Sequence, residues 1–304
     1  MLMKTFLITV PWILISLAIK AQNFYNAWYY NYDLVWEAGA SAGIMNCLTD
    51  LGGRKGNGGR FLKDIRWNSS RPAFQFYIAA TYKDICTIRL NYLRGSVNAA
   101  DSQLKRSDSD PGGRYGRNLS FRSKISEVSL IAETHPLFWG LDIQEKIPAF
   151  SPYILTGIAY YRFNPQTFWG NRWQDLQPLR LEGQGFPTME NRKQYSLRQF
   201  AIPLGAGLRF ETGPLINIRF DCIYRFLFTD YLDDVSTTYV DPALFDTYLD
   251  AEKAALARNL YFRSDERITG AEAVEGTPRG NPKNRDAYFS FQVTLSYVFR
   301  NKVK

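Results

Sequence analysis

The sequence predicts an all-β fold, an eight-stranded antiparallel up-and-down β-barrel that crosses a membrane. Three features indicate it: segments in which apolar and polar residues alternate, connections that are alternately short and long, and an N-terminal export signal. The clearest segment is YFSFQVTLSYVF, residues 288–299, with large apolar groups on one face and mainly hydroxyls and an amide on the other. This pattern is that of an extended strand, whose side chains alternate with period two.

The composition limits the class of protein. Of 304 residues, 45% are hydrophobic and 15% aromatic, and the formal net charge is +8. The mean hydropathy of −0.29 argues against a bundle of membrane-spanning helices. Lys and Arg are dispersed among 29 acidic residues, and no nucleic-acid-binding motif is present, so we expect no nucleic-acid partner.

Residues 1–21 are predicted to be a secretory signal peptide. Lys4 precedes an apolar stretch at 5–19, and Ala21 followed by Gln22 is a plausible cleavage point. A stretch of roughly 15 apolar residues interrupted by Pro11 is short for a spanning helix. We therefore expect residues 22–304 to form a single barrel domain outside the cytoplasm.

Eight segments alternate with period two and are predicted strands. In order they are residues 34–45, 73–82, 85–94, 119–134, 151–163, 199–211, 216–230 and 288–299. The fifth is apolar on both faces, so its register is the least defined. Tight turns at 83–84 and 212–214 and a medium turn at 135–149 alternate with long loops at 46–72, 95–118, 164–196 and 231–287. This alternation is typical of bacterial outer-membrane barrels, with long loops outside and both termini in the periplasm.

The direction of the apolar faces distinguishes a membrane barrel from a lipocalin-like soluble barrel. The summed bulk of the Phe, Tyr, Leu and Ile side chains exceeds what an eight-stranded interior holds. The opposite faces carry small residues and charges, which suit a narrow lumen if the charges are paired. We therefore expect the apolar faces to contact lipid and a charge network to fill the lumen without an open pore. The residues predicted for this network are Glu37, Arg89, Glu127, Glu133, Arg209, Glu211, Arg219, Asp221 and Arg225.

Two further local patterns stand out. Aromatic residues near strand ends are expected in interfacial girdles. They include Trp28, Tyr29, Tyr30, Tyr153, Tyr231 and Tyr288. In the last loop, Asp241 and Pro242 resemble an N-cap and a first helical residue, and apolar residues follow at helical spacing. This pattern predicts one short amphipathic helix over the barrel mouth.

Long strings in the loops carry a resemblance to a known family. They are DLQPLRLEGQG (175–185), TDYLDDVSTTYVDP (229–242), RGNPKNRDAYF (279–289) and RNLSFRS (117–123). With them the chain resembles the PorG-like outer-membrane proteins of the type IX secretion system over essentially its whole mature length. The first loop departs from the family pattern, with Cys47 and Thr49 where Tyr and Gly are expected. The motif residues are Asp175, Gln177, Pro178, Glu182, Gly183, Gly185, Asp230, Tyr231, Asp233, Asp234, Arg279, Gly280, Asn281 and Pro282.

The resemblance implies a non-enzymatic component of the secretion and gliding machinery that needs no cofactor. It implies association with periplasmic ring components, a lipoprotein and a soluble partner, in addition to outer-membrane lipid. We expect recruitment at the periplasmic side, although the same aromatic residues could instead line the membrane interface. The candidate partner-contact residues are Phe24, Trp28, Tyr29, Tyr30, Phe138 and Trp139.

Other chemistry is weakly indicated. Asp230, Asp233 and Asp234 could bind Ca²⁺, but their spacing matches no EF-hand loop, and acids at such junctions commonly cap turns. The three cysteines have no paired spacing, which favours neither a disulfide framework nor a zinc site. Basic residues of the first loop could contact lipopolysaccharide phosphates. They are Arg54, Lys55, Arg60 and Lys63.

Three alternative functions remain open at this point. An outer-membrane enzyme acting on lipid or surface protein needs a base near a nucleophile, and the only histidine, His135, has no Ser or Cys motif beside it. A small porin conflicts with a narrow, charged lumen. An adhesin acting through the long loops is a third class.

Overall fold

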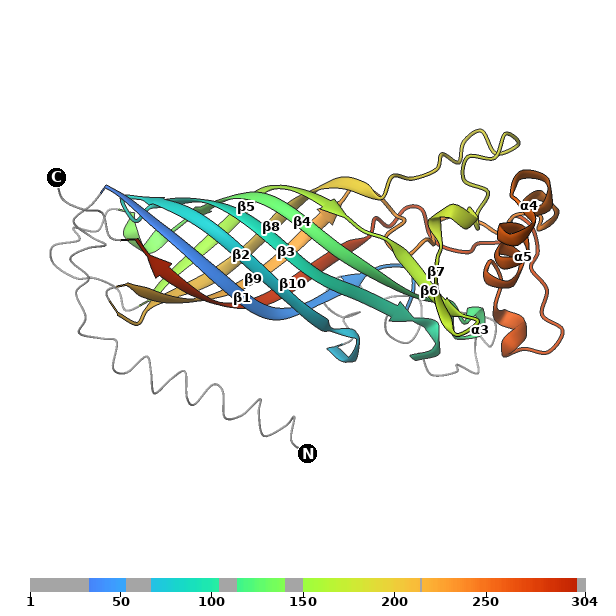
Figure 1. The fold of residues 1–304 in the computed structure, drawn as a ribbon, viewed down its shortest axis with the longest axis horizontal. Helices are drawn as coiled ribbons and strands as arrows, with labels where there is room; N and C mark the ends of the chain where they lie inside the picture. Colours follow the sequence, from blue (N-terminus) through green and yellow to red (C-terminus); the bar gives the residue numbers. More distant parts are fainter. Residues whose placement is uncertain (1–32, 53–66, 104–113, 140–149, 214, 300–304) are drawn as a thin grey trace, which may run out of the picture.

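Eight long strands close into one barrel (Figure 1). The computed structural model describes residues 33–52, 67–103, 114–139, 150–213 and 215–299. Each barrel strand pairs antiparallel with the next, and the last pairs with the first, so the barrel has no free edge. The predicted eight-stranded antiparallel barrel is confirmed. Its strands are β1 (Leu34–Leu48), β2 (Arg71–Tyr82), β3 (Cys86–Ala100), β4 (Ser120–Thr134), β5 (Phe150–Arg162), β8 (Arg198–Glu211), β9 (Ile216–Leu227) and β10 (Ala287–Val298).

The strands present their apolar residues outward, as predicted. On β2, Phe74 and Phe76 are 57% and 61% exposed, whereas the intervening Gln75 is buried. The same alternation holds on β10, where Val293 and Leu295 are exposed and Thr294 is buried. A continuous band of exposed large apolar side chains around a closed barrel is stable against lipid rather than water. The chain is therefore an outer-membrane-type transmembrane barrel.

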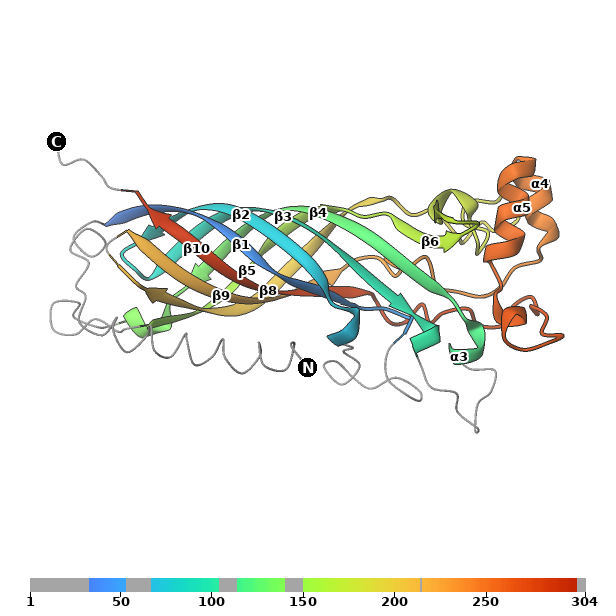
Figure 2. The same cartoon turned by 60° about the horizontal axis from the view of Figure 1, so that its bottom comes forward.

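The two ends of the barrel differ. Three connections, β2–β3, β4–β5 and β8–β9, lie at one end, here called the turn end. The other four lie at the opposite end, here called the loop end, where folded segments extend beyond the barrel (Figures 1 and 2). The β2–β3 turn is tight because Lys83 and Asp84 both have positive φ, +48° and +58°, as a turn that follows the twist of a β-hairpin requires.

The connection between β5 and β8, predicted as a long loop, contains a hairpin. Its strands are β6 (Pro165–Trp169) and β7 (Arg172–Asp175), and β6 continues the sheet by pairing with β4. Several barrel strands also run further toward the loop end than predicted, because inward residues such as Val97 and Cys47 join an apolar cluster there. Short helical turns are η3 (Trp67–Ser69), η4 (Asp101–Gln103), α3 (Arg114–Arg117), η5 (Pro136–Phe138), η6 (Gln177–Leu179) and η7 (Ser264–Glu266).

The single helix predicted for the last loop is wrong in one respect: two helices are present, α4 (Ala243–Tyr248) and α5 (Ala251–Leu260). The chain becomes extended at Leu249, and Asp250 starts α5 by accepting a hydrogen bond from the backbone N–H of Lys253 at 2.9 Å. Asp241 caps the first turn of α4 by accepting from Ala243 N–H, and Pro242 precedes the first helical residue. Both helices lie over the loop end (Figure 2). None of the helices in the described residues is long and apolar enough to cross a bilayer.

The predicted girdle positions of Tyr153 and Tyr288 are wrong. Both side chains point into the barrel and are 1% and 0% exposed. Each hydroxyl finds a buried carboxylate there, which explains why a large ring with a polar tip occupies an inward position. Nearness to a strand end does not specify which face a side chain occupies, and the register of β5 and β10 turns these two tyrosines inward.

Candidate functional site

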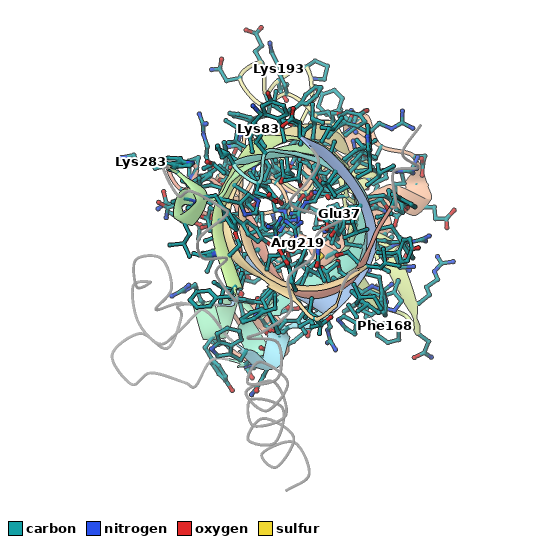
Figure 3. The ribbon with its side chains drawn as sticks, turned by 90° about the vertical axis from the view of Figure 1, so that its left-hand side faces the viewer. Glu37, Lys83, Phe168, Lys193, Arg219 and Lys283 are labelled. Carbon is teal, nitrogen blue, oxygen red and sulfur yellow. The ribbon has the colours of Figure 1, made fainter. Side chains whose placement is uncertain are left out.

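The lumen holds a network of paired charges centred on Arg219 of β9 (Figure 3). Its guanidinium forms ion pairs with Glu37 of β1 and Glu133 of β4. Arg89 of β3 pairs with the same Glu133 at 3.0 Å and with Asp221 at 3.3 Å. All five side chains are buried. Buried ions are tolerated only with partners of opposite charge in good hydrogen-bonding geometry, and strands from four positions around the barrel supply them here.

Two smaller charge clusters lie on either side of the Arg219 network along the barrel axis. Toward the loop end, Arg225 pairs with Glu127 at 3.0 Å, and the same carboxylate accepts a 2.6 Å hydrogen bond from the hydroxyl of Tyr288. At the turn end, Arg209 lies 3.7 Å from both Asp84 and Glu211. The structure thus places all nine residues of the predicted lumen network on inward positions, in three layers. Glu211, at the barrel rim, is the least buried of them.

Two buried amides in the lumen lack hydrogen-bond partners in the described part of the protein. The side chains of Gln75 and Gln292 are buried, and none of their amide atoms has a hydrogen-bond partner among the described protein atoms. Buried amides in such positions are ordinarily hydrated. Paired charged side chains therefore occupy the lumen, and the amides of Gln75 and Gln292 are suited to bind water there.

At the turn end, Phe138 of the segment after β4 packs against the lumen. Phe138 is 3% exposed, and the guanidinium of Arg209 lies 6.0 Å from the centre of its ring. The prediction that Phe138 is exposed to a partner is therefore wrong; its neighbour Trp139 is 59% exposed. The 3₁₀ turn Pro136–Phe138 folds the phenyl ring back over the lumen and turns the indole outward.

His135 forms an arrangement that sequence reasoning did not find. Its Nδ1 lies 2.8 Å from the hydroxyl of Ser151, and its Nε2 lies 3.2 Å from Thr87 Oγ1 and 3.9 Å from Glu133 Oε2. The order Ser–His–Glu resembles a hydrolase triad. All three side chains are buried, however, and burial together with Arg209, Arg219 and Arg89 lowers the pKa of His135. Glu133 forms ion pairs with Arg89 and Arg219, so we interpret this arrangement as packing of the lumen at the turn end.

The loop end has its own polar centre, the Glu182 hub, made of Glu182, Tyr231, Ser236, Thr237 and Arg279. One carboxylate oxygen of Glu182 accepts from Arg279 and from the N–H of Ser236, both at 2.9 Å. The other accepts from the N–H of Thr237 at 2.9 Å, from its hydroxyl at 2.7 Å and from the hydroxyl of Tyr231 at 3.3 Å. Glu182 is fully buried, so the hub fixes three loop segments to one carboxylate.

A second arginine extends the hub to the β3–β4 loop. Arg117 pairs with Asp101, with N–O distances of 2.8 and 3.0 Å, and donates to the backbone carbonyls of Asp50 and Arg279. Gly280 lies against this contact: a Cβ there would be 2.6 Å from Asp50 Oδ2 and 2.7 Å from the N of Ser236. Only glycine allows the chain to approach so closely.

The remaining motif residues lie around this centre or away from it. Tyr231 stacks on Tyr195, with ring centroids 4.7 Å apart, and Gln177 donates to the carbonyl of Tyr195. Gly183 and Gly185 have φ of +72° and +75°, which favours glycine. Pro178 lies in η6, and Asn281 and Pro282 are exposed beside the hub. Asp175 lies apart, on the hairpin, where it accepts from Asn164 and Gln166.

Of the aspartates considered for Ca²⁺, Asp233 caps a turn and Asp234 binds a tyrosine hydroxyl, whereas neither carboxylate oxygen of Asp230 has a hydrogen-bond partner among the described protein atoms. Asp233 accepts from the N–H groups of Leu51 and Val235, and Asp234, with φ of +66°, accepts from the hydroxyl of Tyr195 at 2.6 Å. Burial raises the pKa of Asp233 and of Asp234 to about 7 and that of Asp230 to about 8. In the part of the chain that the structure describes, no group of three or more potential ligands is arranged to hold a metal ion.

Several predicted residues lie outside the described part of the chain. They are the signal peptide at 1–21, the aromatic residues Phe24, Trp28, Tyr29 and Tyr30, and the basic loop residues Arg54, Lys55, Arg60 and Lys63. Expectations for them stay predictions.

Residues 70–242, more than half of the sequence, match the family described as "Domain of unknown function (DUF6089)". The chain belongs to this family. The matched segment of this DUF6089 protein includes strands β2 to β9, the hairpin and the first two segments of the Glu182 hub. No curated protein matches the sequence significantly.

Solved outer-membrane barrels are similar to this DUF6089 protein at low identity. Neisserial surface protein A (NspA) has a TM-score of 0.40 and 8% identity, covering 88% of this chain and 98% of that one. A major outer membrane protein from Thermus thermophilus has a TM-score of 0.38 and 14% identity, covering 88% and 100%. The outer membrane enzyme PagL has a TM-score of 0.26 and 10% identity, covering 86% and 97%.

Proposed function

We propose that this barrel is a non-enzymatic outer-membrane component of the type IX secretion and gliding machinery, where it anchors periplasmic ring components. The observation that carries the proposal is the convergence of the four loop strings that resemble the PorG-like proteins. Three of them supply Glu182, Tyr231 and Arg279 to one buried hub, and the fourth reaches Arg279 through Arg117. Strings that share one hydrogen-bonded centre are expected to occur together in a family.

The filled lumen supports an anchoring role over a transport role. Charged layers around Arg219, Arg225 and Arg209 occupy the interior from one end to the other. Disrupting them would leave unpaired buried charges, which is costly. The surfaces that remain for function are the two ends and the lipid-facing wall.

In this proposal the loop end faces the outside of the cell, and the turn end and both termini face the periplasm, as is usual for outer-membrane barrels. A periplasmic lipoprotein and its soluble partner would then contact the turn end. Trp139 and Leu137, 59% and 39% exposed, are the described apolar side chains of the β4–β5 connection available for such a contact.

Site-specific cross-linking in living cells tests this proposal. A photo-reactive residue is introduced at Trp139, and separately at Trp173, a 43% exposed tryptophan of the β6–β7 hairpin at the other end. We expect position 139 to capture a periplasmic lipoprotein whose deletion blocks type IX secretion, identified by mass spectrometry, and position 173 not to capture it.

Capture of the same protein from both positions, or of no periplasmic protein from position 139, would count against recruitment at the turn end. An affinity pull-down from solubilised outer membranes provides the second criterion. Purification as an isolated barrel with lipid-modifying activity would replace the proposal with an enzymatic function.

A further inference from the structure

Three arginines lie in one lateral row on the outer wall of the barrel, near the loop end. Arg94 of β3 is opposite Ser126 of β4, Ser126 is opposite Arg162 of β5, and Arg162 is opposite Arg198 of β8. The three arginines are exposed. Because neighbouring strands are about 4.8 Å apart, the row runs over roughly 15 Å of the wall. Lys124, also exposed, lies two residues further toward the loop end on β4.

An apolar row lies directly beneath the arginine row. Two residues along each of the same strands, Tyr92, Val128, Tyr160 and Phe200 are opposite one another in the same order. They are 43%, 47%, 44% and 57% exposed, and the rings of Tyr160 and Phe200 lie 5.2 Å apart. Below them the wall continues with Leu90, Leu130 and Ile158, all exposed. The arginine row therefore marks the boundary at which the lipid-facing wall becomes charged.

Within the described part of the chain, the arginine row has no countercharge. The acidic residues on β3, β4, β5 and β8 are Glu127, Glu133 and Glu211, each paired with an arginine on the lumen side. Among the described residues, Arg94, Arg162 and Arg198 take part in no salt bridge. Arg162 and Arg198 are directly opposite each other on paired strands, an arrangement that is destabilising unless an anion is bound between them.

We propose that this row binds the phosphate groups of an anionic glycolipid of the outer leaflet, of the diphosphorylated lipid A type, with its acyl chains over the Tyr92–Phe200 row. The proposal rests on the orientation given under Proposed function, in which the loop end faces outward. Guanidinium groups bind phosphate through paired, charge-assisted hydrogen bonds. A headgroup with two phosphates can contact Arg94 with one and the Arg162–Arg198 pair with the other. This site lies on the wall and includes none of the first-loop basic residues Arg54, Lys55, Arg60 and Lys63.

The test is lipid binding by the purified, full mature chain in phosphatidylcholine nanodiscs. Binding of diphosphorylated lipid A is compared with binding of its dephosphorylated form. The triple variant Arg94→Gln, Arg162→Gln, Arg198→Gln removes the charges, and Lys193→Gln, Lys283→Gln, Arg285→Gln is the matched control on exposed loop residues. We expect the wild type to prefer the phosphorylated lipid at least tenfold, the triple variant to lose this preference, and the control to retain it within about twofold.

Equal binding of the two lipids by the wild type, or an unchanged preference in the triple variant, would overturn the proposal. The single variant Arg162→Gln disturbs the wall less and is expected to weaken the preference at least threefold, so the test does not depend on the triple variant folding. Because the assay uses no secretion partner, it is independent of the cross-linking result at Trp139. Failure to capture a partner at Trp139 leaves the lipid-binding proposal standing, because the two proposals share only the orientation of the barrel.

Discussion

At the scale of single residues, the buried carboxylate of Glu182 joins separate segments of the described loops. Its carboxylate compensates Arg279, which is itself buried, and satisfies two backbone N–H groups. Removing one partner of a buried ion pair leaves the other charge without compensation. The loop end therefore depends on this residue more than on any cap or surface ion pair nearby.

We predict that Glu182→Ala lowers the free energy of local unfolding at the loop end by about 3–5 kcal/mol. Hydrogen exchange of the amides of Ser236 and Thr237, which donate to Glu182, measures it. Glu190→Ala, an exposed glutamate of the same loop, is the control and should leave both amides protected. Equal protection in the two variants would contradict the assigned role of the hub.

The buried aspartates predict a pH dependence. The pKa values of Asp233 and Asp234, about 7, and of Asp230, about 8, lie above the ordinary value of 3.8, so the folded loop end binds protons more tightly than the unfolded chain. Its stability is therefore greatest at low pH and declines as pH rises from about 4 through 7 to 8. Pulse proteolysis of segment 229–241 at pH 5.5, 7.0 and 8.5 measures this decline.

Asp234→Asn keeps the acceptor for Tyr195 and removes the charge, so we expect a weaker pH dependence in this variant. Asp265→Asn, at an exposed position of the same loop, should follow the wild type. If the wild-type loop end became more resistant to proteolysis as pH rises, the pH dependence would have the opposite sign. That result would contradict the raised pKa values of these aspartates.

At the scale of elements, the closing seam between β1 and β10 depends on Gly43. A Cβ at this position would lie 1.9 Å from the carbonyl oxygen of Phe291 on the paired strand. We predict that Gly43→Ala destabilises the barrel by about 1–3 kcal/mol, as overpacking does. Heat-dependent migration in detergent gels measures it, since a folded barrel and its unfolded chain migrate differently.

The control for the seam is Ala42→Ser, at the neighbouring exposed position on the outer wall. It should migrate like the wild type at every temperature. If Gly43→Ala melted at the wild-type temperature, the seam would not need a glycine and the close approach of the two strands would be wrong.

The barrel strands could be predicted from the sequence, because period-two alternation is a local pattern. A lipid-facing wall and a charged lumen require apolar and polar residues to alternate strictly along each strand. The β6–β7 hairpin was missed, although Gly170 and Asn171, both with positive φ, form a two-residue turn signal between Trp169 and Arg172. The break between α4 and α5 had a similar local signal in the N-cap Asp250. Both were overlooked inside long loops.

The Glu182 hub and the partner choices in the lumen could not be predicted. Glu182 and Arg279 are 97 positions apart, and Glu37 and Arg219 are 182 apart. Alternation predicts which side chains face the lumen, but the register around the whole barrel determines which of the lumen charges form ion pairs. The inward turn of Phe138 likewise depends on a 3₁₀ turn after β4 that apolar character alone does not specify.

At the scale of the whole molecule, the barrel separates its charges by face. Acidic residues on the strands β3, β4, β5 and β8 point inward and are paired with arginines, whereas arginines outside any salt bridge of the described residues lie on the outer wall. The outer-wall arginines border a lipid-facing band of apolar side chains. The loop end is covered by the hub and by α4 and α5, and Phe138 covers the lumen at the turn end.

The conductance of the purified protein in planar bilayers tests this filled interior most directly. With insertion verified in the same preparation by heat-dependent migration, we predict no stable channel current across the membrane. Steady ohmic channels from the folded wild-type barrel would show a continuous aqueous path, and would contradict a lumen occupied by the ion pairs of Arg89, Arg219 and Arg225.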